Sequence, residues 1–168
     1  EGKGLETWNT ENVTTMQNMF SGADSFNGNI SGWNTQNVTT MQNMFAGADS
    51  FNGNISGWNT QNVTTMQNMF AGAEAFDQNL GNWNIQNMVH MENMLDNSGM
   101  SNENYGNTLI GWATLDEGEE QIPQGITLGA TGLSVCDGAL AETALLNLTT
   151  TESWTVFDEG TVDCPPQP

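Results

Sequence analysis

The large apolar residues of this chain return at a fixed interval of 25 residues. In the unit that starts at Trp33, they occupy these positions: Trp33, Val38, Met41, Met44, Phe45, Ala48, Phe51 and Ile55. The spacing from Met41 through Met44 and Phe45 to Ala48 places these side chains on one face of a short helix or 3-10 turn. We therefore expect one short helical turn in every unit.

The rest of the unit predicts extended and looping backbone. Val38 lies in N-V-T-T, a β-favouring segment bounded by asparagine. The segment from Phe51 to Trp58 contains two glycines and has little helix propensity, so it must turn and return the chain. One unit is then a coil with a single apolar face, which only a stacked neighbouring coil can cover.

Four units follow one another, and they predict a repeat solenoid over residues 1–111. They start at Trp8, Trp33, Trp58 and Trp83. The first unit differs from the second at two positions, and the third keeps 18 of the 25 residues. The fourth unit has diverged further and carries four extra residues before Trp112. An array that decays in this way is approaching its cap.

Stacking aligns equivalent residues in columns. We expect two asparagine columns to satisfy backbone groups of successive coils; they are Asn12, Asn37, Asn62 and Asn87, and Asn18, Asn43, Asn68 and Asn93. Two threonine columns flank the extended segment, and we expect both to face water; they are Thr10, Thr35 and Thr60, and Thr14, Thr39 and Thr64.

Residues 112–164 predict a small α+β capping unit that covers the open apolar end of the stack. We expect strands at 126–128 and 154–156, and a helix that Asp137 caps and that extends to about Leu148. Leu140, Ala144, Leu145 and Leu148 would lie on one side of that helix. Residues 165–168 read as the start of a proline-rich linker, and we expect the chain to be part of a longer polypeptide.

Charge narrows the range of partners. One basic residue, Lys3, opposes 20 acidic residues, which gives a net charge of −19. We therefore do not expect nucleic acid or an anionic membrane surface as a partner, because both are bound through Lys and Arg. No apolar run is long enough to cross a bilayer, so we expect no membrane insertion. A neutral ligand, a positive partner or a divalent cation remains compatible with this charge.

The two cysteines, Cys136 and Cys164, favour a disulfide. A zinc site would need more ligands at close spacing, and His90 is the single histidine. The bond would close a loop of about 29 residues and contribute about 3–4 kcal/mol in the loop-entropy model. It would also indicate an oxidising compartment. Two buried free thiols are the alternative.

The sequence favours no enzymatic activity and no cofactor. We find no nucleophile motif, no phosphate loop and no convincing pair of acids, and His90 has no recurring partners.

Asp24 and Asp49 are weak candidates for calcium binding, because each lies in a copy of the oxygen-rich segment D-S-F-N-G-N. Their spacing differs from that of a calcium-binding loop, so a polar turn is the favoured interpretation. The acidic segment 116–120 is likewise interpreted as a solvated loop.

The unit W-N-T-Q-N-V-T-T-M-Q-N-M-F-A-G-A-D-S-F-N closely resembles the repeat of BspA-type leucine-rich-repeat surface proteins. The tail, with N-Y-G-N-T-L-I-G-W and G-L-S-V-C, resembles the segment that closes such arrays. The resemblance implies a right-handed, leucine-rich-repeat-like solenoid in a bacterial secreted or cell-surface protein, and a role in adhesion to a host or matrix surface. This chain departs from the family at Thr15, Thr40 and Thr65, where Asp, Asn or Ser is common, which changes the chemistry of one exposed column.

Together these features predict a non-catalytic extracellular adhesion module. Repeated amide and hydroxyl groups can offer many weak hydrogen bonds to a glycan, a peptide or a host or matrix surface protein, and repetition provides avidity. We expect the contacts at the two threonine columns named above. The first alternative is a passive stalk that spaces another domain from the cell. A minor alternative is ice binding, because threonine arrays on a flat face are what that activity needs.

Overall fold

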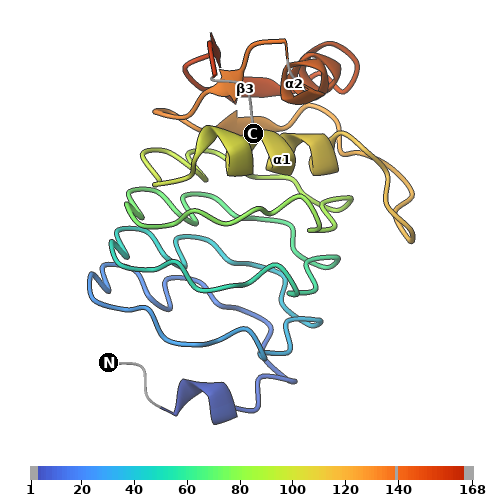
Figure 1. Cartoon of the computed structure of the whole chain (residues 1–168). Helices are drawn as coiled ribbons and strands as arrows, with labels where there is room; N and C mark the ends of the chain where they lie inside the picture. Colours follow the sequence, from blue (N-terminus) through green and yellow to red (C-terminus); the bar gives the residue numbers. More distant parts are fainter. Residues whose placement is uncertain (1–3, 139, 165–168) are drawn as a thin grey trace.

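The computed structural model describes residues 4–138 and 140–164 of the chain. Successive 25-residue units form coils that stack on one another from the N-terminal to the C-terminal end (Figure 1). A short 3-10 helix, η1 (Leu5–Thr7), precedes the first coil. The C-terminal part holds two helices and four short strands: α1 (Asn102–Trp112), β1 (Thr127–Gly129), β2 (Val135–Cys136), α2 (Leu140–Thr150), β3 (Thr155–Phe157) and β4 (Thr161–Val162).

Backbone hydrogen bonds join each coil to the next in parallel register. Thr15, Thr40, Thr65 and His90 form consecutive parallel bridges. The Thr39 N–H donates to the Thr14 carbonyl oxygen at 2.9 Å, and the Thr64 N–H repeats this bond one coil later at 2.9 Å. The strands of the repeats are thus reduced to isolated bridges. Their backbone groups are satisfied by neighbouring coils, so no coil is complete alone.

The expected helical turn is wrong, because the segment after the bridge folds as consecutive tight turns. The Met44 N–H donates to the Met41 carbonyl and the Ala48 N–H donates to the Phe45 carbonyl. Asn43 and Gly47, each third in its turn, have φ values of 53° and 66°. A turn with positive φ at its third residue favours Gly or Asn there. The two columns that contain Asn43 and Gly47 therefore have a conformational role.

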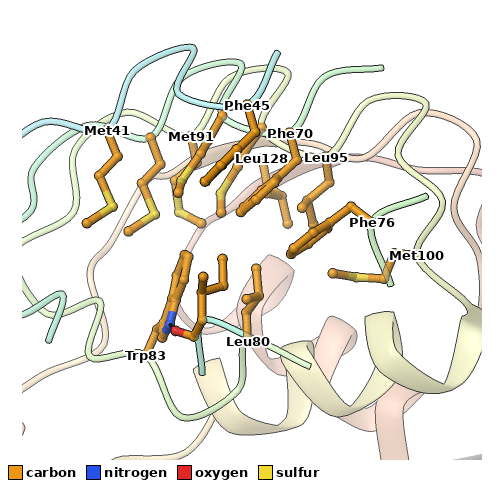
Figure 2. Close-up of a cluster of buried hydrophobic side chains, with 14 of the residues drawn as sticks. Met41, Phe45, Phe70, Phe76, Leu80, Trp83, Met91, Leu95, Met100 and Leu128 are labelled. Carbon is orange, nitrogen blue, oxygen red and sulfur yellow. Dashed lines mark hydrogen bonds between the residues drawn. The ribbon is translucent and has the colours of Figure 1, made fainter. Parts of the chain in front are cut away.

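The apolar positions expected in the core are buried. Met41, Met44, Phe45 and Ala48 are fully buried in the second coil. Within a coil the Phe45 and Phe51 rings stack with centroids 3.9 Å apart, and each ring stacks on its equivalent in the next coil. Figure 2 shows Phe45, Phe70 and Phe76 along one side of the core, with Trp83 facing them from the opposite side. Each such side chain contributes about 1.5–3 kcal/mol before the entropy cost.

Tryptophans form a second column that runs beyond the repeats. The Nε1–H groups of Trp58 and Trp83 donate to carbonyl oxygens 28 residues earlier. Trp112 makes the same bond across 32 residues, to Leu80 at 3.1 Å, so the difference of four matches the four extra residues. Those residues are accommodated by α1, which replaces the looping return of the fourth unit (Figure 1).

Coil spacing differs across the stack. Between the second and third coils, the stacked ring centroids are 5.6 Å apart for Phe45–Phe70, 6.1 Å for Phe51–Phe76 and 6.5 Å for Trp33–Trp58. Hydrogen-bonded strands lie about 4.8 Å apart. A pure translation would move every atom by one distance, so the coils must also rotate slightly. They lie farther apart at the tryptophans than where backbone hydrogen bonds join them, at the bridges and in the turns.

The start of α1 is fixed by the acidic side chain of Asp77. Asp77 Oδ1 accepts hydrogen bonds, each 2.8 Å long, from the Ser101 N–H, the Ser101 hydroxyl and the Asn104 amide. Burial alone would raise the pKa of Asp77, but these hydrogen bonds outweigh it and lower the pKa below its usual value. Ser101 also caps α1 by accepting from the Asn104 N–H.

The C-terminal region extends the ladder of the repeats. Leu128 in β1 forms a parallel bridge with Met91 of the fourth coil, and β3 then pairs in parallel with β1. The ladder therefore crosses residue 112, where the sequence pattern changes, without interruption. Trp154 packs beside Trp112 with ring centroids 6.4 Å apart, but the two rings are tilted by 46° and not stacked as in the repeats.

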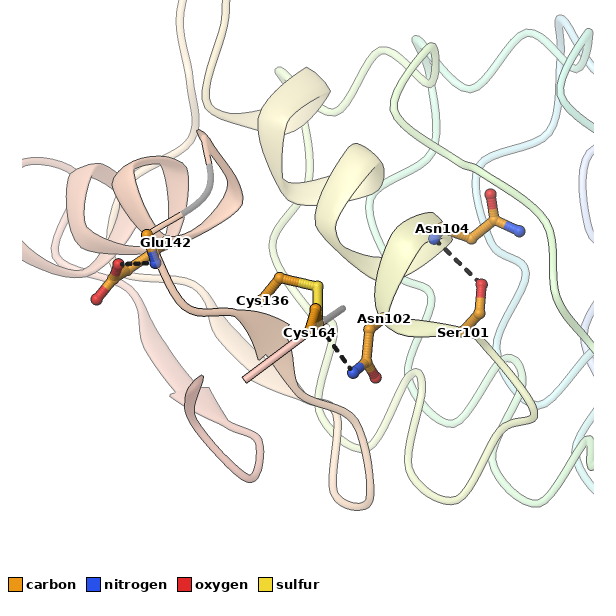
Figure 3. Close-up of a disulfide and its surroundings, with 7 residues drawn as sticks. Ser101, Asn102, Asn104, Cys136, Glu142 and Cys164 are labelled. Carbon is orange, nitrogen blue, oxygen red and sulfur yellow. Dashed lines mark hydrogen bonds between the residues drawn. A yellow bond between two sulfur atoms is a disulfide. The ribbon is translucent and has the colours of Figure 1, made fainter. Parts of the chain in front are cut away.

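Helix α2 and the disulfide complete this region. Of the residues expected on one side of this helix, Leu148 and Ala144 are buried, whereas Leu140 is 75% exposed. Leu140 is the first residue of α2. The predicted disulfide Cys136–Cys164 is confirmed and fastens the chain just after β4 to β2 (Figure 3). The expected linker 165–168 lies outside the described residues.

A partly buried hydrogen bond ties α1 to the residue that follows β3. The Tyr105 hydroxyl donates to Asp158 Oδ2 at 2.8 Å. Burial and the neighbouring Asp158 carboxylate raise the pKa of Tyr105 far above its ordinary value, so the phenol stays protonated and remains a donor.

In the described part of the chain, no helix is both long enough and apolar enough to span a membrane.

Candidate binding surface on the strand side of the coils

Two adjacent threonines in each coil point away from the core at the bridges. In the second coil, Val38 and Met41 are fully buried, and they bracket Thr39, which is exposed, and Thr40, which is half-buried. The tight turn that follows Met41 fixes the direction of this segment. The same local sequence therefore presents two hydroxyl groups per coil on one side of the stack.

The first outward column consists of Thr14, Thr39 and Thr64, which are exposed as expected. The hydroxyl of Thr39 donates to the Thr14 carbonyl at 3.2 Å, and the Thr64 hydroxyl repeats that bond to Thr39. Each hydroxyl oxygen keeps lone pairs that a ligand donor can reach. Val89 follows in the fourth coil and is 55% exposed.

The second outward column is longer than the repeat array. It runs along the bridges and strand pairs through Thr15, Thr40, Thr65, His90, Thr127 and Thr155. Sequence reasoning placed the first three together but did not connect Thr127 and Thr155 to them. The signal was the threonine in each of the two predicted strands, I-T-L and W-T-V. The pairing of those strands with the fourth coil could not be read from the repeat.

Amide side chains flank the threonines. The Gln42 amide donates to Gln67 Oε1 at 2.9 Å, which links consecutive coils. Asn37 and Asn62 each donate to a backbone carbonyl of the preceding coil at 2.8 Å, so the predicted stacking of their column is confirmed, although these residues are exposed. We use the name strand face for these outward columns, whose members in the first three coils are Asn12, Asn37, Asn62, Thr14, Thr39, Thr64, Thr15, Thr40, Thr65, Gln17, Gln42 and Gln67.

The expectation that Thr10, Thr35 and Thr60 face water is wrong. Their exposed fractions are 4%, 2% and 1%. The Thr35 hydroxyl donates to the Asn59 carbonyl of the next coil at 2.9 Å, and the other two make the equivalent bond. Each of these threonines lies two residues after a tryptophan and turns inward, and the tryptophan itself is buried in the second and third coils. Their role is to satisfy backbone carbonyls between coils.

The first charged side chains on the strand face occur in the fourth coil. His90 takes the place of threonine and Glu92 takes the place of glutamine. His90 Nδ1 lies 3.1 Å from Glu92 Oε1, and the imidazole is largely exposed. The strand face is therefore uncharged in the first three coils, and the fourth coil adds one ionisable pair to it.

The calcium candidates lie elsewhere on the coils. Asp24 and Asp49 occupy an exposed column that continues with Glu74, and their backbone carbonyls accept bonds from the next coil. Within the described residues, no group of three or more His, Cys, Asp or Glu side chains is placed to hold a metal ion. The column belongs to a polar turn, and its carboxylates are separate from the strand face.

Comparison with protein families gives one match. Residues 1–108 match the model of a family described as Mycoplasma protein of unknown function, DUF285. The chain belongs to this DUF285 family. The matched region contains all four repeats and most of α1. Searches of curated proteins and of solved structures gave no match.

Proposed function

We propose that this DUF285 chain is a non-catalytic adhesion module of a larger, secreted or cell-surface bacterial protein. In this proposal the stack is a right-handed, leucine-rich-repeat-like solenoid of the BspA type, and its strand face binds a glycan, a peptide or a host or matrix surface protein. The observation that carries the proposal is the uncharged strand face of the first three coils on a protein with a net charge of −19.

The chemistry of the strand face suits a neutral, hydrogen-bonding ligand. Thr39 offers acceptor lone pairs, and the Gln67 amide retains N–H donors after it accepts from Gln42. No carboxylate of the first three coils lies in these columns. None would therefore repel a ligand or have to lose its bound water when the ligand binds. A ligand with hydroxyl or amide groups would therefore meet complementary donors and acceptors.

Repetition would turn weak contacts into useful affinity. Each coil presents the same pair of threonines in the same register. A ligand with its own repeat could engage several coils at once, and linked sites gain avidity without any new contact. The coils lie closer together at the bridges than at the tryptophans, so the strand face lies on a shorter side of the stack than the tryptophans do. That shape favours contact with a convex ligand over contact with flat ice.

The disulfide supports the proposed location. Cys136–Cys164 joins two segments that already pair as β2 and β4. Such a bond persists in an oxidising environment. The proposal of a secreted or cell-surface protein is consistent with this bond and with the acidic surface.

A passive stalk is the second candidate. It is favoured by the equality of the contacts between coils: the bond from Thr39 to Thr14 and the bond from Thr64 to Thr39 are both 2.9 Å long. When the contacts between coils are identical, the length of the stack is proportional to the number of repeats. A stalk would not need the strand face to remain uncharged, and this difference separates the two candidates.

The test is a binding screen of the chain, multimerised on a scaffold, against glycan and peptide arrays. The variant Thr14→Glu/Thr39→Glu/Thr64→Glu adds three charges to the strand face. The matched control, Ser25→Glu/Ser50→Glu/Ala75→Glu, adds three charges to another exposed column. We expect binding to fall at least tenfold in the first variant and to persist in the second. Equal binding by both folded variants would refute the strand face, and a blank screen with folded protein would favour the stalk.

A further inference from the structure

An aromatic ring replaces an amide side chain at the C-terminal end of the outward columns. In the second coil, Gln42 follows the bridging residue Thr40 by two positions. Phe157 follows Thr155, the last threonine of the same column, by the same two positions. Phe157 is 58% exposed, and Val89, in the neighbouring column, is 55% exposed. The strand face therefore ends in apolar surface, whereas its first three coils carry hydroxyl and amide groups.

The Phe157 ring shares its side of β3 with a hydroxyl group. Successive side chains of a strand point to opposite faces, so Thr155 and Phe157 lie on one face and Val156 on the other. The exposure of these residues agrees with this alternation, because Thr155 and Phe157 are exposed while Val156 is half-buried against the core. Thr127 of β1 pairs with Thr155 in register. One aromatic ring and two hydroxyl groups are thus neighbours on the strand face.

The residue that pairs with Phe157 has no side chain to cover the ring. That residue is Gly129 of β1. A Cβ atom at position 129 would lie 2.2 Å from the Asn93 nitrogen, so the backbone of the fourth coil requires glycine there. Aromatic side chains can shield such glycines in sheets. Phe157 nevertheless keeps more than half of its surface accessible, so shielding would not use the whole ring.

We propose that Phe157 is an aromatic subsite of the strand face and stacks on one sugar ring of a neutral glycan. This inference rests on the proposed adhesion function and names a ligand class for it. One face of a sugar ring carries C–H groups that pack on an aromatic ring, while the sugar hydroxyl groups project sideways as donors and acceptors. Thr155 and Thr127 lie beside the ring to bond those hydroxyl groups. Further sugars would extend over the threonine and glutamine columns toward the first coil.

A glycan suits this face better than a peptide does. Peptides that bind to sheets pair with a free strand edge. The bridges of the inner coils offer no such edge sideways, because their backbone groups bond to neighbouring coils, as the Thr64 N–H does to the Thr39 carbonyl. A ligand on the strand face therefore meets side chains, whose hydroxyl and amide groups match sugar hydroxyl groups. The net charge of −19 disfavours sugars that carry carboxylate or sulfate groups.

Binding of the multimerised chain to an array of neutral glycans and an array of peptides tests the inference. Phe157→Ala removes the ring, and Phe157→Trp keeps an aromatic side chain. The matched control, Leu146→Ala, removes an apolar side chain that is 60% exposed on α2, outside the strand face. We expect Phe157→Ala to weaken glycan binding about tenfold, as loss of an aromatic anchor does, and the other two variants to bind within about twofold of wild type.

The Phe157→Trp variant also reports on stacking directly. Its introduced indole should emit at shorter wavelength when a sugar ring covers it. The probe is the neutral glycan that gives the strongest signal on the array. Wild-type chain, in which Trp8 is 56% exposed, supplies the baseline for the same titration and should show no such shift.

The outcomes separate this inference from the adhesion proposal. Glycan binding that persists in folded Phe157→Ala but is lost in Thr14→Glu/Thr39→Glu/Thr64→Glu would overturn the subsite and leave the adhesion proposal standing. Binding to peptides alone would have the same meaning. No binding to either array by the folded wild-type chain would overturn both.

Discussion

The three near-identical coils and the C-terminal third build the same ladder from different sequences. In the repeats, coil joins coil through bridges such as Thr40–Thr65, with positive-φ Asn and Gly residues shaping the turns. In the C-terminal third, β1 and β3 continue those bridges, while α1, α2 and a disulfide take over the return of the chain. The comparison shows that the two regions share the stacking register, whereas the return path of the chain differs between them.

Removing a ring from an inner coil should have the largest effect on stability. Phe45 is fully buried and stacks on Phe51, Phe20 and Phe70. We expect Phe45→Ala to lower the free energy of unfolding by about 3–5 kcal/mol, as truncation of buried aromatic residues does. Urea unfolding followed by circular dichroism measures this loss.

The matched control lies in the C-terminal third. Phe157 in β3 is 58% exposed, so Phe157→Ala should change stability by no more than about 0.5 kcal/mol. A large loss at Phe157 together with a small loss at Phe45 would mean that the ring stack does not hold the repeats together.

Loss of the disulfide should rank second and should act on one region. We expect Cys136→Ala/Cys164→Ala to cost about 2–4 kcal/mol. The loss should appear first at β2 and β4, for example as faster exchange of the Asp137 N–H, which donates to the Val162 carbonyl. The Thr64 N–H, in the repeats, should keep its protection in the same hydrogen-exchange experiment. Equal loosening of both sites would contradict a locally acting bond.

The two threonine columns should differ in their contribution to stability. Thr35→Val removes a buried hydroxyl that donates to the Asn59 carbonyl, at a cost of about 1 kcal/mol. Thr39→Val changes an exposed residue and should cost less than about 0.5 kcal/mol. Thermal unfolding of the two variants side by side provides the measurement. The reverse order would mean that the inward and outward columns have been misassigned.

The smallest effect should be a dependence on pH at the junction of the two regions. The pKa of Asp77 is lower in the folded protein than in the unfolded chain, so its ionised form stabilises the fold above an unfolded pKa of about 3.9. That contribution is lost as the pH falls through the folded pKa. Because Asp77 is partly exposed, we expect less than about 1 kcal/mol.

The variant Asp77→Asn, which restores the residue found at Asn27 and Asn52, isolates this term. We expect it to be less stable than wild type at pH 7 and to approach wild type as the pH falls below the folded pKa. Urea unfolding at a series of pH values measures the difference. A constant difference at all pH values would show that the carboxylate charge has no role at the start of α1.

Periodicity predicted which side chains form the core, because burial recurs once per coil. It did not predict the tight turns, since the spacing of Met41, Met44 and Phe45 suits a helical turn as well as it suits successive turns. The choice depends on Asn43 and Gly47, whose positive φ excludes a helix. Thr35 and Thr39 are the same residue type in the same repeat, so residue type alone does not predict which one is buried. Their positions in the coil decide it: Thr35, near Trp33, is buried, and Thr39, next to Val38, is exposed.

The C-terminal third was less accessible to sequence reasoning. The strands β1 and β3 and the helix α2 were predicted near their observed places, and the cysteines pair as predicted, whereas α1, β2 and β4 were not predicted. The pairing of Leu128 with Met91 could not be predicted, because the four-residue insertion and α1 break the periodicity that aligns equivalent positions. The continuation of the outward column to Thr127 and Thr155 depends on that pairing.

Native-state hydrogen exchange tests the central claim, which is that one ladder runs without a break from the repeats into the C-terminal third. The informative amides are those of Thr64, Gly129 and Thr155, which donate to Thr39, Met91 and Ile126 of the preceding rungs. We predict that all three exchange with protection factors within about tenfold of one another. A sharp fall in protection between Thr64 and Gly129 would show two independent units and would contradict the account.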